Sequence, residues 1–382
     1  MGVNTFEYGD DVVGYCKLES TYGTGVAPAA TDAFKALSIV ITPVVDRRLQ
    51  EDDAKTRSQM GSQAGRTSAT WTAEVYFRPS GSLGVAPDVG ELLKLVCGTE
   101  AVVASTSVTY TLLKDMTGLF ASIFKDLSSM QEFATSAIVQ NFTITGNGED
   151  YIRMTFSGVA KQYGKVGRVL ANGSGSGATA LIVDDADDLA QWGLIQIDTD
   201  DNSGAGFLIS AIDHTTETAT IPAASWDTTD PVTAFLPTAT LTGTPVMGVD
   251  GQVSLDGDSS QVKFLDWSIS VDTGLDLLNR EYGDSSPTDV TMPNKRAVTA
   301  SLNMLVKQNE THLNSLFQRK QAQDLFITVG DTAGQRAKFD MPNFEVDPGG
   351  PTSPTSGEVE LSVSGRAYGT GSGENELSIL LD

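Results

Sequence analysis

The stretch Trp71-Thr72-Ala73-Glu74-Val75-Tyr76-Phe77-Arg78 decides the fold class of this chain. Its apolar and polar residues largely alternate with a period of two, which is typical of a β-strand with one buried and one wet face. Similar alternation recurs at Ser38–Thr42, Ile138–Thr145, Tyr151–Ala160, Trp267–Asp272, Val298–Val306, Lys338–Val346 and Glu358–Ala367. The sequence therefore predicts a mainly β fold.

Helical patterns are few and short. Asp88–Gly98 has an Asp that can cap a helix and a Gly just past its end, and 309–323 carries apolar residues at helical spacing. Pro28–Leu37 is consistent with one further short turn of helix. The glycines and Asn of Gly146–Asp150 predict a tight hairpin with positive φ angles.

Composition excludes several classes of protein. The 382 residues include 25 Lys+Arg and 49 Asp+Glu, a net charge of −24, which disfavours a DNA reader or a binder of anionic membranes because both need concentrated positive charge. The two cysteines, Cys16 and Cys97, cannot form a disulfide framework, and we expect both to be small, partly buried hydrophobes. Met1–Asp11 lacks the pattern of a signal peptide, and no apolar run is long enough to span a membrane, so the sequence predicts folding in a cytosol.

The order of patterns suggests an internal duplication. Ile39 and Ile41 match Ile269 and Val271 at an offset of about 230 residues, and the strand at Trp71 matches the one at Val298 at about 227. A polar stretch separates the two strands in each half, and a short helix and a hairpin follow them. Paired anchors close each half: Asn141-Phe142 with Asn343-Phe344, and Ser157-Gly158 with Ser364-Gly365.

A different segment lies between the halves, at about 167–237. It opens on Gly173-Ser174-Gly175-Ser176-Gly177, which reads as a flexible linker, and continues with short apolar runs separated by turn residues. We interpret it as a small independent β-barrel or β-sandwich.

Motifs for chemistry are weak. Asp198, Asp200 and Asn202 begin a calcium-loop pattern, but Ser203 and Ile209 stand where an EF-hand needs Gly and Glu, so an acidic turn is favoured. His214 and His312 have no Cys or Ser nucleophile in a recognised motif beside them. The sequence therefore predicts no enzyme, no cofactor and no metal site, with the Asp198 turn as the only weak metal candidate.

The polar stretch 46–66 has two readings. It holds charged residues of both signs and almost no apolar residue after Leu49, so it is either a solvated mobile loop or an arm that orders on a neighbouring subunit. The residues proposed for such an inter-ring contact arm are Arg47, Arg48, Asp52, Lys55, Arg57 and Arg66. The corresponding loop of the second half, 279–295, has similar character, and two arms in one chain favour an assembly protein.

The start of the chain resembles the major tail (tail-tube) proteins of long, non-contractile-tailed bacteriophages. The resemblance rests on Glu19-Ser20-Thr21-Tyr22-Gly23-Thr24, on Ser38-Ile39-Val40-Ile41-Thr42-Pro43, and on the polar arm, strand, Pro79-Ser80-Gly81 and helix that follow. It covers Glu19–Gly164 best and reaches Leu265–Asp382 through the repeat.

The resemblance implies two β-sandwich units, each with a short helix and a long polar arm, at 1–166 and 241–382, with the inserted domain 167–240 on the outer surface. It implies rings stacked into the tube of a virion tail, assembled in the host cytoplasm, with tape-measure and tail-terminator or tip proteins as partners. DNA would pass through the lumen without specific binding, during genome ejection. Two units per chain imply a trimeric, pseudo-sixfold ring, with a hexamer as the alternative.

Two other classes of function stay open at this point. A secreted or cell-surface adhesin or glycan-binding protein would use the Asp-rich turns as calcium loops, although no signal peptide supports export. A hydrolase on a β scaffold is the third reading, and no motif favours it.

Overall fold

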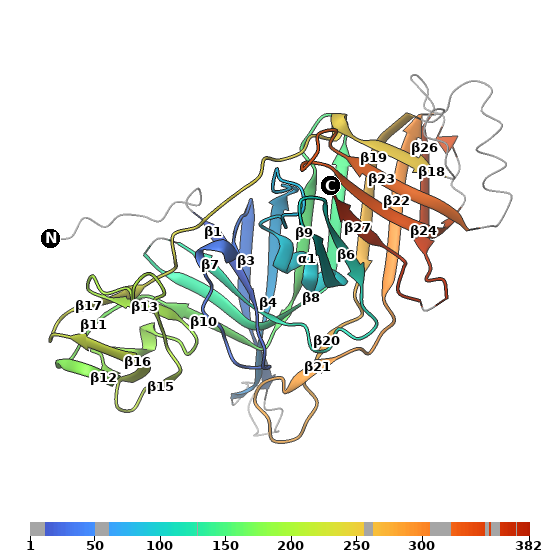
Figure 1. Ribbon diagram of the computed structural model, residues 1–382. Coiled ribbons are helices and arrows are strands. Elements are labelled where there is room, and N and C mark those ends of the chain that lie inside the picture. Colours follow the sequence, from blue (N-terminus) through green and yellow to red (C-terminus); the bar gives the residue numbers. More distant parts are fainter. Residues whose placement is uncertain are drawn as a thin grey trace, which may run out of the picture.

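The computed structural model describes residues 12–49, 61–127, 129–255, 263–305, 322–347, 351–352, 360–371 and 373–382. Antiparallel strands dominate this part of the chain (Figure 1), as the alternation predicts. The predicted helix at 309–323, with His312, lies almost wholly outside the described residues. Within them, no helix is long and apolar enough to cross a membrane.

One continuous sheet of eight strands forms the first layer. Its strand order is β3-β4-β9-β8-β19-β22-β26-β24, and every neighbouring pair is antiparallel. The bounds are β3 Ser38–Leu49, β4 Ser62–Tyr76, β8 Gln131–Asn147, β9 Arg153–Ala160, β19 Lys263–Asp272, β22 Ala297–Leu305, β24 Ala337–Asp347 and β26 Glu360–Ala367. A short strand, β25 (Pro351–Thr352), pairs with β26 beyond β24.

Two outer sheets cover one face of this layer. The first has the order β2-β1-β7-β8-β10, and the second has the order β18-β23-β24-β27-β6-β5. Long bent strands, β8 and β24, take part in both an outer sheet and the eight-stranded sheet. The new bounds are β1 Val13–Leu18, β2 Ala33–Lys35, β5 Gly98–Val103, β6 Ser107–Leu112, β7 Ala121–Asp126, β10 Gln162–Val166, β18 Gln252–Leu255, β23 Gln323–Val329 and β27 Ser378–Leu381.

A single apolar core fills the space between the layers and runs through both halves of the chain. The inward positions of β4, from Ala69 to Val75, are fully buried, and the indole Nε1 of Trp71 donates to the carbonyl of Ile138 at 3.1 Å. Helix α1 (Gly90–Cys97) packs its apolar face on this core and ends at Gly98, whose φ of +100° favours glycine. Asp88 does not cap the helix, because its carboxylate accepts the backbone N–H of Thr242 at 2.9 Å.

The same strand pairings occur twice along the chain. β1, β3, β4, β7, β8, β9 and β10 correspond to β18, β19, β22, β23, β24, β26 and β27 in order and in partners. The offsets at β3 and β4 agree with the ladder, since Ile41 faces Trp71 as Val271 faces Val298.

The hairpin anchors read from sequence are shifted by two residues. The register can be followed from β4 through β9 to β8, and in the repeat from β22 through β26 to β24. It makes Asn141-Phe142 equivalent to Glu345-Val346 of the second half, and not to Asn343-Phe344. A slip of two keeps every side chain on its face, so alternation alone does not detect it.

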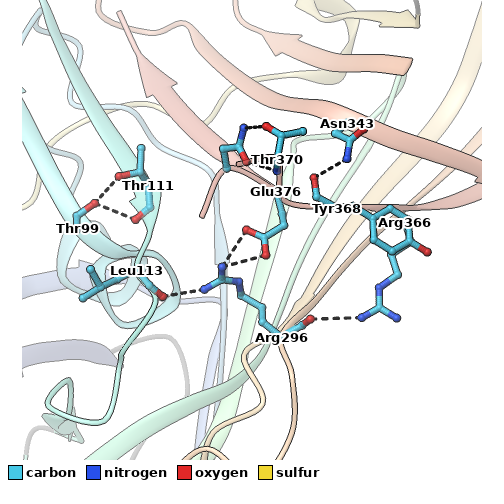
Figure 2. A network of polar contacts seen from close by, with 10 residues as sticks. Thr99, Thr111, Leu113, Arg296, Asn343, Arg366, Tyr368, Thr370 and Glu376 are labelled. Atoms are coloured by element: carbon cyan, nitrogen blue, oxygen red, sulfur yellow. Dashed lines mark hydrogen bonds and ion pairs between the residues drawn. The ribbon is translucent and has the colours of Figure 1, made fainter. Parts of the chain in front are cut away.

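The hairpin β5–β6 departs from the expected division of the chain. It belongs to the first half in sequence, but β6 pairs with the C-terminal β27 in the outer sheet of the second half. Figure 2 shows one further contact across this link: the Arg296 guanidinium donates to the carbonyl of Leu113 in the first half at 2.8 Å, and it is held by both carboxylate oxygens of Glu376 in the second half, at 2.9 and 3.1 Å. The two halves therefore share one body.

Two small sheets lie between residues 168 and 234, with orders β11-β17-β13-β14 and β12-β16-β15. Their bounds are β11 Arg168–Leu170, β12 Gly175–Ile182, β13 Leu194–Ile197, β14 Phe207–Leu208, β15 Ala211–Asp213, β16 Thr218–Trp226 and β17 Pro231–Ala234. The expected linker 173–177 is wrong, because β12 starts within it. Figure 1 shows this group to one side of the main body.

This inserted group is docked on the outer sheet of the first half. Its apolar residues share one cluster with Tyr15, Phe124 and Phe133 of that sheet. The side chain of Gln131 donates to the carbonyl of Phe235 at 3.1 Å and accepts the N–H of Leu194 at 3.0 Å. The insert is therefore held by apolar packing and by specific hydrogen bonds.

Three short 3-10 turns complete the described elements: η2 Ala30–Asp32, η3 Ala186–Asp188 and η4 Gly248–Asp250. The first falls inside the predicted turn at Pro28–Leu37. The hairpin turn at Gly146–Asp150 has no positive φ angle, contrary to expectation. The side chain of Asn147 forms it instead, because its Oδ1 accepts the N–H groups of Glu149 and Asp150 at 3.0 and 2.7 Å.

Candidate assembly surface

Apart from its end at Ile138 and Val159, on which Leu275, Leu277 and Val290 pack, the eight-stranded sheet presents one face that no other described layer covers. Alternate residues of its strands point away from the core, and about half of them carry hydroxyl groups. The serines and threonines of this face are Ser38, Thr42, Thr70, Thr72, Thr143, Thr145, Thr155, Ser157, Ser268, Ser270, Thr299, Ser301, Ser362 and Ser364. We call this surface the hydroxyl face.

Hydroxyl groups bond to one another across neighbouring strands. Thr143 Oγ1 lies 3.2 Å from Ser270 Oγ, at the pairing of β8 with β19, and Ser268 Oγ lies 3.1 Å from Ser301 Oγ on the next strand. The guanidinium of Arg153 contacts the carboxylate of Glu74 at 3.3 Å on the same face. The face is thus polar and carries few basic groups.

Both edges of the eight-stranded sheet are open within the part of the chain that the structure describes. β3 pairs with β4 on one side only, and the 345–347 portion of β24 pairs with β26 on one side only. β3 is long and exposes Val40, Val44, Val45 and Leu49. An exposed apolar edge strand of this length is a template for pairing with another chain.

The predicted arm is an extension of the β3–β4 hairpin. Pairing continues from the core outward to Leu49 and Ser62, so the described parts of 46–66 are largely strand and not an irregular loop. Arg47 is exposed, and Arg48 contacts Asp46 at 2.9 Å on the surface. Asp52, Lys55 and Arg57 lie outside the described residues.

Arg66 has a role within the chain that its sequence context does not reveal. Its Nε donates to the carbonyl of Asp284 at 3.2 Å, and its Nη2 donates to the carbonyl of Glu281. The N–H of Thr67 donates to Ser285 at 2.9 Å. The loop of the second half, which follows β19, is therefore clamped against the first arm.

That second loop also carries a two-stranded hairpin, β20 (Asp276–Leu278) with β21 (Asp289–Thr291). Leu275, Leu277 and Val290 pack with Met116, Phe120 and Ile138 of the first half. The second arm is thus seated across the β8–β19 junction, at the lower end of the molecule in Figure 1.

The weak metal candidates form an ordinary acidic turn. Asp198 and Asn202 have positive φ angles, and the N–H of Asn202 donates to Asp200 Oδ1 at 2.9 Å. The side chain of Asn202 donates to the carbonyl of Gly206 at 2.9 Å. Among the described residues, no three His, Cys, Asp or Glu side chains are grouped to hold a metal ion.

Titratable groups in the interior lie away from the hydroxyl face. Burial raises the pKa of the Cys97 thiol to about 12 and also raises the pKa of Cys16, so neither behaves as a nucleophile. The buried Glu19 carboxylate accepts hydrogen bonds from Ser122 Oγ (2.6 Å) and from the N–H and Oγ of Ser136 (2.8 and 2.7 Å). Loss of hydration raises the pKa of Glu19 despite these bonds. The contacts attach the segment after β1 to strands β7 and β8.

Comparison with known proteins identifies one family. The model of a family described as phage tail tube protein matches residues 9–367. No curated protein matches the chain.

Proposed function

Because the chain belongs to the phage tail tube protein family, we propose that three copies close into a ring through the two open sheet edges, and that rings stack into the tube. The chain is a structural protein of the virion tail and assembles with copies of itself. The observation that supports the ring most directly is the β8–β19 junction inside the chain.

This junction is a template for the contact between subunits. β19 is the repeat of β3, and β8 is the first-half equivalent of β24. Within the chain, the β19 edge is paired with the β8 edge, in antiparallel register. In the proposed ring, the open β3 edge of one copy therefore pairs with the open β24 edge of the next copy, just as their repeats β19 and β8 pair within one chain.

The template also specifies the register. Asp272 faces Asn141, Val271 faces Phe142 and Ser270 faces Thr143. Translated through the ladder, the pairs between two copies are Thr42 with Glu345, Ile41 with Val346 and Val40 with Asp347. Closure by these pairs removes both edges and forms a heterologous ring.

The size of the ring follows from the strand spacing. Three chains of eight strands give 24 strands about 4.8 Å apart. Strands parallel to the tube axis give a circumference of about 115 Å and a diameter of about 37 Å between backbones, and strand tilt enlarges both. Six chains would give 48 strands and a diameter of about 73 Å. The smaller ring is wide enough for a DNA duplex and is the one we propose.

In this ring the hydroxyl face lines the channel. Hydroxyl groups and a net charge of −24 offer phosphates little to bind, so DNA slides without being held. The tape-measure protein occupies the same lumen before ejection, and terminator or tip proteins cover the ends of the stack. The insert, docked on an outer sheet, lies on the outside of the tube. Assembly takes place in the host cytoplasm.

Native mass spectrometry of rings from the purified chain tests the proposal. Three chains of 40.3 kDa give about 121 kDa. A ring of about 242 kDa, with six chains, would contradict it.

A pair of variants tests the register separately. Val40→Asp with Thr42→Asp sets two like charges against Asp347 and Glu345 at each junction, whereas Val40→Lys with Thr42→Lys sets two opposite charges there. Both positions are exposed in the single chain, so the two variants cost the subunit similar stability. We expect the aspartates to weaken each junction by about 0.4–2 kcal/mol, and the lysines to retain rings. Equal behaviour of the two variants would show that these strands do not meet.

A further inference from the structure

Tyr282 is the most exposed large side chain in the described part of the molecule. It stands at the tip of the second loop and is fully accessible to solvent. Gly283 follows it with a φ of +98°, a conformation that only glycine adopts readily, so the tip has a defined shape. Arg66 holds the carbonyls on either side of the tip, those of Glu281 and Asp284. The aromatic ring is therefore presented on a preorganised support, which lowers the entropic cost of docking.

A groove of about 320 Å³ lies at the opposite end of the same junction. Its lining includes Asn147, Gly148, Val249, Gln252, Leu265 and Trp267. Val249 and Leu265 are exposed, and Met247 and Tyr151 beside them are exposed as well. The lining combines apolar side chains and polar atoms in similar amounts, which suits an aromatic ring that carries one hydroxyl group.

Both features lie on one line along β19. The groove surrounds the start of this strand, and Tyr282 follows ten residues after its end at Asp272. The ten residues of β19 span about 33 Å. In Figure 1 the yellow β18 segment beside the groove is at the upper end, and the β20–β21 loop is at the lower end. Tyr282 therefore does not reach the groove of its own chain.

Charge disfavours contact between two groove ends. The loop end carries exposed Arg47, Arg48 and Arg280 together with exposed Asp46, Glu281 and Asp284, so its charges nearly balance. The groove end carries exposed Glu149 and Asp250. Two groove ends therefore repel each other, whereas a loop end meets a groove end without net repulsion.

We propose that Tyr282 of one copy docks in this groove of a second copy in the next ring. The inference rests on the proposed stacking of rings and assigns its main contact to the second loop, with Arg66 as the residue that positions the loop. Because the contact joins different surfaces, it repeats without limit along the tube.

A variant that blocks either side of this contact should lose the stacking of rings and keep the closure of each ring. Tyr282→Ala removes the ring of an anchor residue, and we expect the critical concentration for tubes to rise at least tenfold, while Tyr282→Phe keeps most of the contact. Gly148→Trp places a large side chain in the groove lining, and its Cβ meets no atom within 4 Å in the subunit and needs no positive φ. Gly148→Ala is the matched control.

Mixing the two blocked variants gives the sharpest result. Gly148→Trp rings still offer Tyr282, and Tyr282→Ala rings still offer an open groove, so an equimolar mixture should form pairs of rings and no tubes. Tubes from either variant alone, at wild-type concentration, would overturn the proposal.

A disulfide between copies gives an independent readout. The double variant Asp284→Cys with Val249→Cys keeps Tyr282. The native Cys16 and Cys97 are buried and therefore do not form disulfides between copies. Oxidised tubes should give a ladder of linked chains, and each single cysteine variant should not. If the wild-type chain forms tubes and the double cysteine variant gives no ladder, the Tyr282 contact alone is refuted. If the wild-type chain forms neither rings nor tubes, the proposed function is refuted.

Discussion

Replacing Arg296 by Met should cost the protein a measurable part of its stability, because this side chain links both halves of the chain. The guanidinium binds both oxygens of Glu376 and the carbonyl of Leu113, and the side chains of Arg296 and Glu376 are only 12% and 16% exposed. Removal leaves a carboxylate and a carbonyl with little access to water. Breaking a fully buried pair costs 3–5 kcal/mol, and the residual exposure reduces our expectation to about 2–3 kcal/mol.

The corresponding shift in melting temperature follows from the size of the chain. Unfolding entropy of about 2.1 cal/mol/K per residue gives about 0.8 kcal/mol/K for 382 residues, so Tm should fall by about 2.5–4 °C. Urea unfolding of the unassembled subunit, followed by Trp fluorescence, measures the free energy directly. Arg336→Met is the matched control, since its pair with Asp382 is 44% and 30% exposed and its loss should cost much less than that of Arg296.

A double variant separates the ion pair from general packing. Arg296→Met with Glu376→Leu replaces two partly buried charges by apolar groups, and it should recover most of the loss. A single variant that costs less than about 0.5 kcal/mol, or a double variant whose losses simply add, would refute this account of the link.

Three further outcomes follow from the same structure. Deleting residues 168–236 should leave ring assembly intact only when Tyr15, Phe124 and Phe133 are also made polar, since the insert covers these three side chains. A soluble deletion variant that folds but forms no rings would place the insert in the tube wall. Glu19→Gln should gain stability relative to wild type as pH rises from about 4.5 to 7, measured by urea titrations. The pKa of Glu19 is raised in the folded state, so the folded wild type holds a proton that the unfolded chain releases above about pH 4.3. A stability difference that stays flat or has the opposite sign would contradict the burial of Glu19. Gly158→Ala and Gly365→Ala should each lose more than about 2 kcal/mol, because the new Cβ would lie 1.9 Å from the Ile138 carbonyl oxygen and 2.3 Å from that of Glu345, whereas Gly148→Ala should cost nothing measurable in the same melt.

The faces of the strands were predictable from sequence because the alternation at Trp71 is a local property. The arm was not, since the β3–β4 hairpin extends past the core and both of its faces are wet, which removes the period that marks a strand. The docking of the insert was hidden for the opposite reason: Phe124 and Phe133 belong to an outer sheet that is covered on both sides, so their neighbours do not alternate clearly.

The candidate surface was only partly accessible from sequence. Alternating Ser and Thr, as at Ser268 and Ser270, did carry the signal for a hydroxyl face. The clamp between Arg66 and the loop at Asp284 depends on residues more than 200 positions apart, and no local pattern indicates such a contact. The open edges of β3 and β24 likewise follow from strand order in space.

Electron cryomicroscopy of tubes grown from the purified chain tests the central claim most directly. We predict three chains per ring, a barrel of 24 strands at least about 37 Å across between backbones, and β3 of each chain paired with β24 of its neighbour, with Val40 opposite Asp347. Six chains per ring, or a ring in which the β3 edge meets any strand other than β24, would contradict the account.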